Sequence, residues 1–197
     1  MRYLALLALA PCAGCVGDYT ALEFQSSGTA LVAMGTIDDT TPGVFNAVLA
    51  RHPQADTLVL RSIAGSVDDD ANLAFSRAVR SAGLDTVVPG DGMVASGGTD
   101  LFLAGVRRTI EPGACVGVHS WGSGFTSGAT VPRSDPVHEA YLSYYDDMEI
   151  DRNFYWFTLE AAPADAMHWM TAAETRTFGM ATEPVSDLSP APVCETR

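Results

Sequence analysis

Hydrophobic positions along the chain follow two spacings, one typical of strands and one typical of helices. The unbroken apolar run at residues 57–60 is typical of a buried parallel strand. Further short strands are predicted at residues 86–88 and 114–118, and a pair with hairpin spacing at 20–25 and 29–34. Apolar residues three and four positions apart predict helices, at residues 42–52, 71–82, 136–148 and 150–161. Strands that alternate with helices in this way predict an α/β layered domain.

The stretch from Asp91 to Trp121 carries the residue types of a hydrolytic site. Ser96 opens an apolar, helix-like run at residues 101–104, and His119 closes the strand predicted at 114–118. A serine nucleophile needs a base to take its proton and N–H donors to hold the oxyanion that its attack creates. Unpaired N–H groups at a helix N-terminus supply such donors. Taken alone, Ser96 is better explained as a helix cap and His119 as an ordinary residue at a strand end.

Four blocks of sequence, in a fixed order, decide between these interpretations. They are GTIDD (35–39), LVLRSIAGSV (58–67), ASGG (95–98) with GVH (117–119), and WMTAAE (169–174) with FGM (178–180). In this order and spacing the blocks resemble the Clp protease proteolytic subunit superfamily within the wider Clp/crotonase fold, and the resemblance covers residues 29–182. The resemblance implies a spiral of β-β-α units, with a mainly parallel sheet flanked by helices. It also implies a serine peptidase.

The resemblance assigns a role to each site residue. Ser96 is the expected nucleophile, His119 the expected base, and Gly65 and Gly97 the expected oxyanion donors through their backbone N–H groups. The loop before Gly65 departs from the family's Ser-Pro-Gly-Gly pattern at Ile63 and at residue 64, which is alanine here. Both replacements keep a backbone N–H, so an oxyanion hole is still expected.

The third member of a catalytic triad is less well marked. Met167 stands where the family has an aspartate, and Asp165 lies two residues earlier, so Asp165 is the expected orienting group. His168 is an alternative, and so is a site that works as a Ser/His dyad. Less favoured alternatives are Asp147 and Asp151. The other two histidines, at positions 52 and 138, are expected on exposed helix surfaces.

The start of the chain predicts export. Arg2 precedes a short apolar segment, residues 3–10, which is too short to span a bilayer but fits a secretory signal. Ala13-Gly14-Cys15 resembles the end of a bacterial lipobox, with Cys15 as the lipidated residue. The expected organisation is a signal peptide and lipobox at 1–15, a Clp/crotonase-like domain at 16–183 and an irregular tail at 184–197. An ordinary cleaved signal or a buried apolar start are the alternatives.

Charge and cysteine usage narrow the function further. A formal net charge of −13 argues against a nucleic-acid partner, because phosphates would not be neutralised. All 11 basic residues are arginines, so a Ser-Lys dyad, as in signal-peptide peptidases of the same superfold, is excluded for this chain. Cys115 and Cys194 either pair in an oxidising compartment or stay free thiols. No metal-ligand spacing occurs, and no cofactor is expected.

The sequence therefore predicts an exported bacterial serine hydrolase of Clp-like type, anchored in the cell envelope (periplasm) through a lipid. Its expected partner is a peptide or protein substrate. The aromatic run at residues 154–157 favours a homo-oligomer, as the resembled family forms rings. Two other functions stay open: a catalytically inactive binding or scaffold protein on this fold, and a crotonase-type enzyme acting on an acyl thioester.

Overall fold

The strands form one large mixed sheet and one small hairpin. The computed structural model describes residues 19–123 and 126–197. The sheet contains eight strands, namely β1 (Glu23–Ser27), β2 (Ala30–Ile37), β3 (Thr57–Ser66), β4 (Asp85–Val88), β5 (Met93–Ala95), β6 (Arg108–Ile110), β7 (Cys115–Val118) and β10 (His168–Trp169). The hairpin consists of β8 (Gly122–Ser123) and β9 (Thr126–Ser127). Within the sheet all pairs are parallel except β1 with β2 and β10 with β7.

Strand β3 divides the sheet into two branches. Residues 57–59 of β3 pair with β4, which pairs with β6. Further along, Ser62 and Ile63 pair with β5, which pairs with β7. A strand that serves two branches must be buried along most of its length, and its alternate residues, including Leu58, Leu60 and Ile63, are fully buried.

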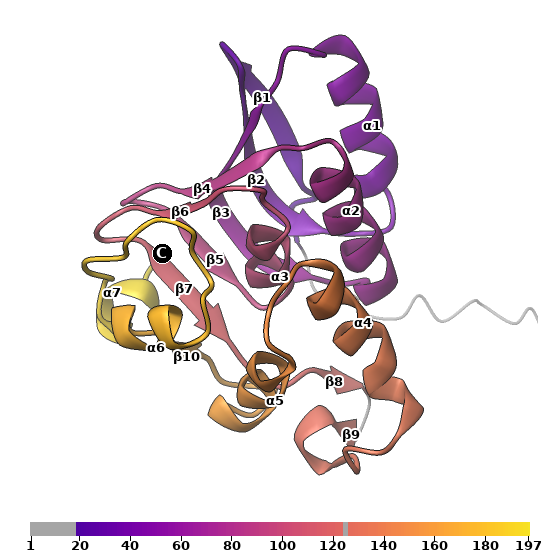
Figure 1. The fold of residues 1–197 in the computed structure, drawn as a ribbon, viewed down its shortest axis with the longest axis vertical. Coiled ribbons are helices and arrows are strands. Elements are labelled where there is room, and N and C mark those ends of the chain that lie inside the picture. Colours follow the sequence, from indigo (N-terminus) through magenta and orange to yellow (C-terminus); the bar gives the residue numbers. More distant parts are fainter. Residues whose placement is uncertain (1–18, 124–125) are drawn as a thin grey trace, which may run out of the picture.

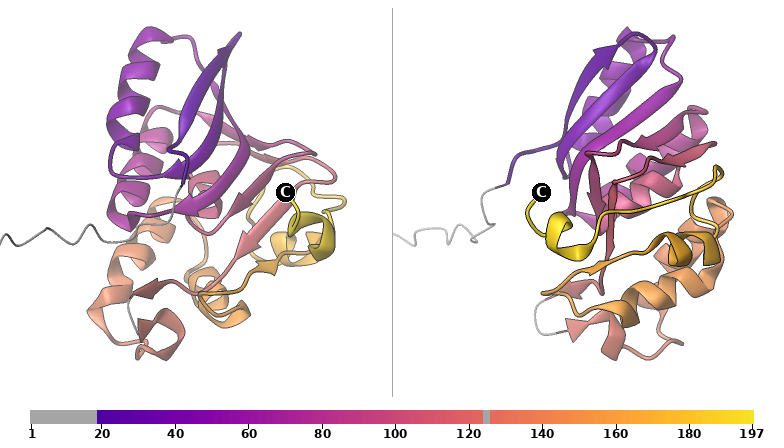
Figure 2. Two further views of the ribbon diagram at one scale, coloured as in Figure 1. Left: turned by 180° about the vertical axis from the view of Figure 1, so that it is seen from behind. Right: turned by 90° about the vertical axis from the view of Figure 1, so that its left-hand side faces the viewer.

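The described residues also form seven α-helices and two 3₁₀ turns. They are α1 (Thr41–Arg51), α2 (Asp69–Ser81), α3 (Gly97–Leu103), α4 (Glu139–Asp147), α5 (Arg152–Ala161), α6 (Ala172–Thr177) and α7 (Ala191–Cys194), with 3₁₀ turns η1 (Gly128–Thr130) and η2 (Pro136–His138). Figures 1 and 2 show α1, α2 and α3 together on one face, with α4 and α5 beyond α3. Asp68 caps α2 by accepting a hydrogen bond from the N–H of Ala71. The rings of Phe45 and Phe75, one from α1 and one from α2, meet at 5.0 Å over the buried sheet.

The predicted α/β fold with a mainly parallel sheet flanked by helices is confirmed, with differences at the site. The segment after residue 60 was expected to be a loop, but β3 continues to Ser66 because Ser62 and Ile63 pair with β5 and Ser66 with Ile37 of β2. Strands β5 and β6 were not among the strands predicted from the sequence. Short strands with polar or glycine neighbours give little periodicity, which explains both omissions.

The aromatic run of α5 is used inside the chain. Phe154 and Tyr155 are fully buried, and Phe157 packs on Phe178 with ring centroids 4.8 Å apart. This removes the reason for expecting a homo-oligomer, which stays a prediction. The predicted signal segment 1–15, with Cys15, lies outside the described residues. Across the residues that the structure describes, no helix is both long and apolar enough to cross a membrane.

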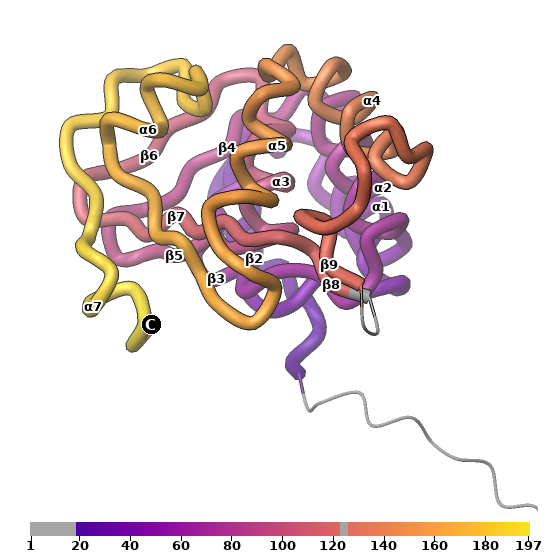
Figure 3. The backbone as a smooth tube through the Cα atoms, turned by 90° about the horizontal axis from the view of Figure 1, so that it is seen from below, coloured from indigo at the N-terminus to yellow at the C-terminus, as the bar shows by residue number. Residues whose placement is uncertain are grey.

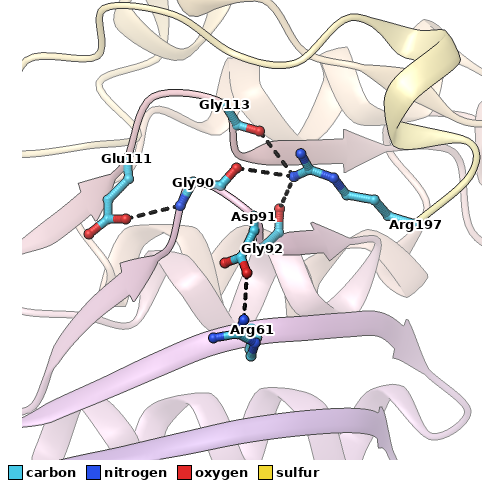
Figure 4. Close-up of polar contacts among 7 residues, drawn as sticks. All are labelled: Arg61, Gly90, Asp91, Gly92, Glu111, Gly113 and Arg197. Carbon is cyan, nitrogen blue, oxygen red and sulfur yellow. Dashed lines mark hydrogen bonds and ion pairs between the residues drawn. The ribbon is translucent and has the colours of Figure 1, made fainter.

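Residues 184–197 run along the side of the molecule away from α1 and α2, as Figure 3 shows. They are irregular up to the one-turn helix α7, where Cys194 forms a disulfide with Cys115, the first residue of β7. Arg197 then donates hydrogen bonds from Nη1 to three backbone carbonyls, those of Gly90, Gly92 and Gly113 (Figure 4). These carbonyls belong to the turns that lead into β5 and β7, so the tail holds the starts of the two strands that carry the site.

Candidate active site

Ser96 lies on a sharp turn between β5 and α3. Its backbone has φ 52° and ψ −127°, a conformation that L-residues other than glycine rarely adopt. The turn is held by the N–H of Ser96, which donates to the carbonyl of Gly117 at 3.0 Å, and by the carbonyl of Ser96, which accepts from Thr99 at 2.8 Å. Backbone strain of this kind concentrates at functional sites, where surrounding structure over-determines it. The conformation therefore marks Ser96 as more than a helix cap, and its side chain makes no capping hydrogen bond.

His119 reaches the same place from the neighbouring strand. Strands β5 and β7 are parallel, with Ala95 opposite Gly117, so Ser96 and His119 follow the carboxyl ends of adjacent strands. Both side chains line one pocket. Within the described part of the chain, no hydrogen bond joins the Ser96 hydroxyl to the His119 imidazole. In enzymes without bound substrate such bonds are often long, and they shorten when the substrate binds.

Gly65 and Gly97 both lie against the serine. Gly65 has φ +144°, and a Cβ atom placed on it would lie 3.2 Å from Cβ and 3.6 Å from Oγ of Ser96. Its backbone therefore faces the nucleophile. Gly97 is the first residue of α3, where a backbone N–H has no partner within the helix. The structure thus brings both predicted oxyanion donors beside Ser96, with Gly65 at the end of β3 rather than in a loop.

The environment of His119 favours the neutral imidazole. Burial lowers its pKa, while backbone groups of Ser120 and Ala164 and the charge of Asp69 oppose this effect. A neutral imidazole can accept a proton at neutral pH, as a base for Ser96 must. Nδ1 of His119 is buried and has no hydrogen-bond partner among the described atoms. No described carboxylate therefore orients the ring through Nδ1.

The structure does not bring the expected third residue to His119. Asp165 is exposed in the turn between α5 and β10, and no described residue makes a hydrogen bond to its side chain. His168 contacts Glu174 at 3.0 Å, and Asp147 and Asp151 contact Arg77 and the N–H of Asn153. The carboxylate whose charge acts on His119 is that of Asp69, at the start of α2. The structure thus places Ser96 and His119 on one pocket, with no described carboxylate hydrogen-bonded to the imidazole.

Asp100 is the site residue that sequence reasoning missed. It lies one helical turn after Ser96 on α3, is 8% exposed, and lines the same pocket. The hydroxyl of Tyr145 donates to its Oδ1 at 2.6 Å. Burial raises the pKa of Asp100 to about 7, the charge of Asp69 adds to this, and the Tyr145 hydrogen bond opposes it. The sequence feature that could have identified Asp100 is its position as a single carboxylate within the otherwise apolar segment TDLFL.

Aromatic side chains from α4, α5 and the segment after β7 form the rest of the pocket. Tyr141 and Tyr155 stack with ring centroids 5.3 Å apart, and Trp121 donates from Nε1 to the Tyr155 hydroxyl at 2.9 Å. The Tyr155 hydroxyl also forms a hydrogen bond with Nδ1 of His138, 2.7 Å away. His138 is fully buried, so its predicted exposure was wrong. Its position after Pro136 in a 3₁₀ turn, instead of on the predicted helix face, points it inward.

No group of three or more histidine, cysteine, aspartate or glutamate residues in the described ranges is arranged to hold a metal ion. The chemistry that this site offers is therefore that of its serine, imidazole, carboxyl and phenol groups.

The comparisons with known proteins give the fold. No protein-family model and no curated protein matches the chain. It is similar to the structure of an enoyl-CoA hydratase/isomerase family protein from Silicibacter pomeroyi, with a TM-score of 0.50 and 13% identity over 89% of this chain and 78% of that one. An enoyl-CoA hydratase from Polaromonas sp. JS666 gives a TM-score of 0.50 and 14% identity over 90% and 74%.

A third similar structure is the 1510-N membrane-bound stomatin-specific protease, solved as a mutant in complex with a substrate peptide. It has a TM-score of 0.49 and 14% identity over 79% of this chain and 73% of that chain. At such identities a likeness shows the fold alone, and the two hydratase-type structures carry that argument. The chain therefore has the α/β fold of the Clp/crotonase type, with a mainly parallel sheet flanked by helices.

Proposed function

We propose that the chain is a serine hydrolase, and that its natural substrates are peptides or proteins. The observation that carries the proposal is the strained backbone of Ser96, held at a strand-to-helix turn that opens into the same pocket as His119. In this mechanism Ser96 attacks a carbonyl, and His119 takes the hydroxyl proton and later donates it to the leaving group. The N–H groups of Gly65 and Gly97 hold the oxyanion.

The same proposal includes export to the cell envelope, with Cys15 as a lipid anchor. The Cys115–Cys194 disulfide supports it, because structural disulfides form and persist in oxidising compartments. The export signal itself falls on residues 1–15. Mass spectrometry of the mature N-terminus tests this part, since a lipidated cysteine at position 15 carries the added mass of a diacylglyceryl group on its sulfur and an unmodified cleaved chain does not.

Labelling with a fluorophosphonate probe tests the hydrolase. The probe reacts with a serine only where a base and an oxyanion hole activate it. Wild-type protein is expected to be labelled, and Ser96→Ala and His119→Ala are expected to lose labelling. Asp165→Asn is the matched control, because this exposed carboxylate has no described contact with His119, and it should be labelled at the wild-type rate. Failure of the folded wild type to react would instead favour a binding protein or an acyl-thioester enzyme on this fold.

A further inference from the structure

The pocket beside Ser96 contains an acidic group whose charge is unbalanced. Asp100 is more than nine-tenths buried, and its one side-chain hydrogen bond among the described residues comes from the neutral hydroxyl of Tyr145. Apart from His119, the side chains that line the pocket in the described structure include no basic group. A buried carboxylate without a cationic partner is costly, and burial raises the pKa of Asp100 to about 7 in response.

A second carboxylate lies on the same pocket. Asp69, in the first turn of α2, is exposed, and Ser66 donates a hydrogen bond to its Oδ1 at 3.0 Å. The charge of Asp69 contributes to the raised pKa of Asp100, so the two carboxyl groups repel each other across the pocket. A cation between them would remove that repulsion and balance both charges.

The walls of the pocket suit an organic cation better than a metal ion. Tyr141, Tyr145 and Tyr155 line it together with Trp121. The faces of aromatic rings attract ammonium groups, most strongly where water is excluded. Metal ions, by contrast, require several oxygen or nitrogen ligands at short distance, and the described residues contain no such group of three acidic or histidine side chains.

The volume of the cavity and the position of Asp100 relative to Ser96 restrict which kind of cation fits. The cavity volume is about 40 Å³, which is room for roughly three water-sized groups. An ammonium nitrogen and two methylenes match that volume. Along α3, Asp100 lies four residues, roughly 6 Å, beyond Ser96. This matches a side chain that starts at the carbonyl attacked by Ser96 and ends in a charged group.

We propose that this pocket binds a primary ammonium group, such as the end of a lysine side chain, with Asp100 and Asp69 as its charged partners. Asp100 binds the group at the buried end and Asp69 at the exposed end. In the hydrolase this makes the pocket the specificity site for the residue on the acyl side of the scissile bond. That assignment to a substrate residue rests on the proposed function, whereas amine binding by itself does not.

Two measurements separate the amine site from the hydrolase. The first is titration of the Ser96→Ala protein with n-butylamine, followed by the indole N–H proton NMR signal of Trp121, which is assigned by its loss in Trp121→Phe. n-Butanol is the matched neutral ligand. We expect the signal to shift with butylamine and not with butanol. In Ser96→Ala combined with Asp100→Asn we expect affinity to fall about 10- to 100-fold, the value of a charged hydrogen bond.

Asn at position 100 can still accept the Tyr145 hydrogen bond, so the fold is expected to survive. Should this variant not fold, Asp69→Asn serves instead, because Asp69 is exposed. The second measurement compares kcat/KM for lysine and norleucine p-nitrophenyl esters, which differ only in the ammonium group. A lysine preference of about 10-fold or more, which disappears in Asp69→Asn, supports the proposal.

Each result bears on one of the two proposals. Butylamine binding without hydrolysis of either ester supports the ammonium site and counts against the hydrolase. Hydrolysis of both esters at equal rates, together with no butylamine shift, overturns the ammonium site and leaves the hydrolase standing. Equal butylamine affinity in wild-type, Asp100→Asn and Asp69→Asn pockets also overturns it, because the two carboxylates would then contribute nothing.

Discussion

Gly65 faces Ser96 so closely that a methyl group on Gly65 would lie 3.2 Å from the Cβ of the serine. The glycine also has φ +144°, which is unfavourable for any residue with a Cβ. Gly65→Ala is therefore expected to do two things: to strain the end of β3 and to displace the side chain of Ser96. We expect fluorophosphonate labelling to slow by about 10²-fold and the free energy of unfolding to fall by about 1–3 kcal/mol.

The matched control is Gly83→Ala. Gly83 has a positive φ of +73°, but a Cβ atom on it would meet nothing within 4 Å, and the residue lies after α2, away from the pocket. This variant should lose stability and keep the labelling rate. If Gly65→Ala is labelled as fast as Gly83→Ala, Gly65 is not part of the oxyanion site.

The backbone strain at Ser96 is expected to lower the stability of the protein, and a residue that relieves it should raise the free energy of unfolding. Ser96→Gly and Ser96→Ala both remove the hydroxyl and should both abolish labelling, but glycine alone adopts φ 52° and ψ −127° without strain. We expect urea unfolding to show the glycine variant more stable than the alanine variant by about 1–2 kcal/mol. Equal stability of the two would mean that the turn is not strained.

The pH dependence of labelling should report the environment of His119. Its pKa is lowered by burial, so the imidazole stays neutral to a pH below the usual value of about 6.5. The labelling rate should be constant at neutral pH and fall only in more acidic solution. Asp69→Asn removes a charge that raises the pKa, so the midpoint should move to still lower pH. A midpoint that moves upward would show that Asp69 does not act on His119.

Asp100 should make the protein less stable as the pH rises. Its pKa is about 7 in the folded state, against an ordinary value of 3.8 for an aspartate carboxyl group, so the folded state binds the extra proton. The resulting stabilisation is fully present at a pH below the pKa of the unfolded chain, 3.8, and it is lost as the pH rises through the folded-state pKa of about 7. Urea unfolding of Asp100→Asn should therefore show higher stability than wild type at about pH 8, by roughly 2–4 kcal/mol, with a smaller difference at about pH 5.

The control for this measurement is Asp165→Asn, where an exposed carboxylate is replaced. This variant removes one carboxylate outside the pocket, so it shows the effect of the change in net charge alone. If wild type and Asp100→Asn differ in stability by the same amount at both pH values, Asp100 does not titrate between them.

The disulfide should carry a measurable part of the stability. It closes a loop of 79 residues between Cys115 and Cys194, and bonds of this kind typically contribute about 2–5 kcal/mol. Reduction of the wild type should lower the free energy of unfolding, measured with urea, by that amount. Cys115→Ala combined with Cys194→Ala should match the reduced protein and show no response to reductant. An unchanged unfolding curve on reduction would indicate that the tail contributes no constraint.

The fold, and the position of Ser96 and His119 on one pocket, could be predicted because they rest on patterns that can be recognised in a single sequence. A buried strand such as residues 57–60 is visible in the sequence as an apolar run. The short motifs around Ser96 and His119 occur in the order expected for the resembled family. The third site group was not accessible in this way. Asp165 was chosen by its distance along the chain from a motif, whereas Asp69 and Asp100 reach the pocket from two helices that only the folded sheet brings together. His138 was misplaced for the same reason, because burial depends on what α5 and Trp121 contribute.

The branching of β3 also restricts where insertions and deletions can accumulate. Its first residues are in register with β4 and its later ones with β5, and Gly65 faces Ser96 only in that register. One residue added within β3 would replace the glycine opposite the nucleophile by Ala64 and exchange the two faces of the strand. Homologues that keep the activity should therefore differ in length at turns such as residues 52–56 and never between Thr57 and Ser66.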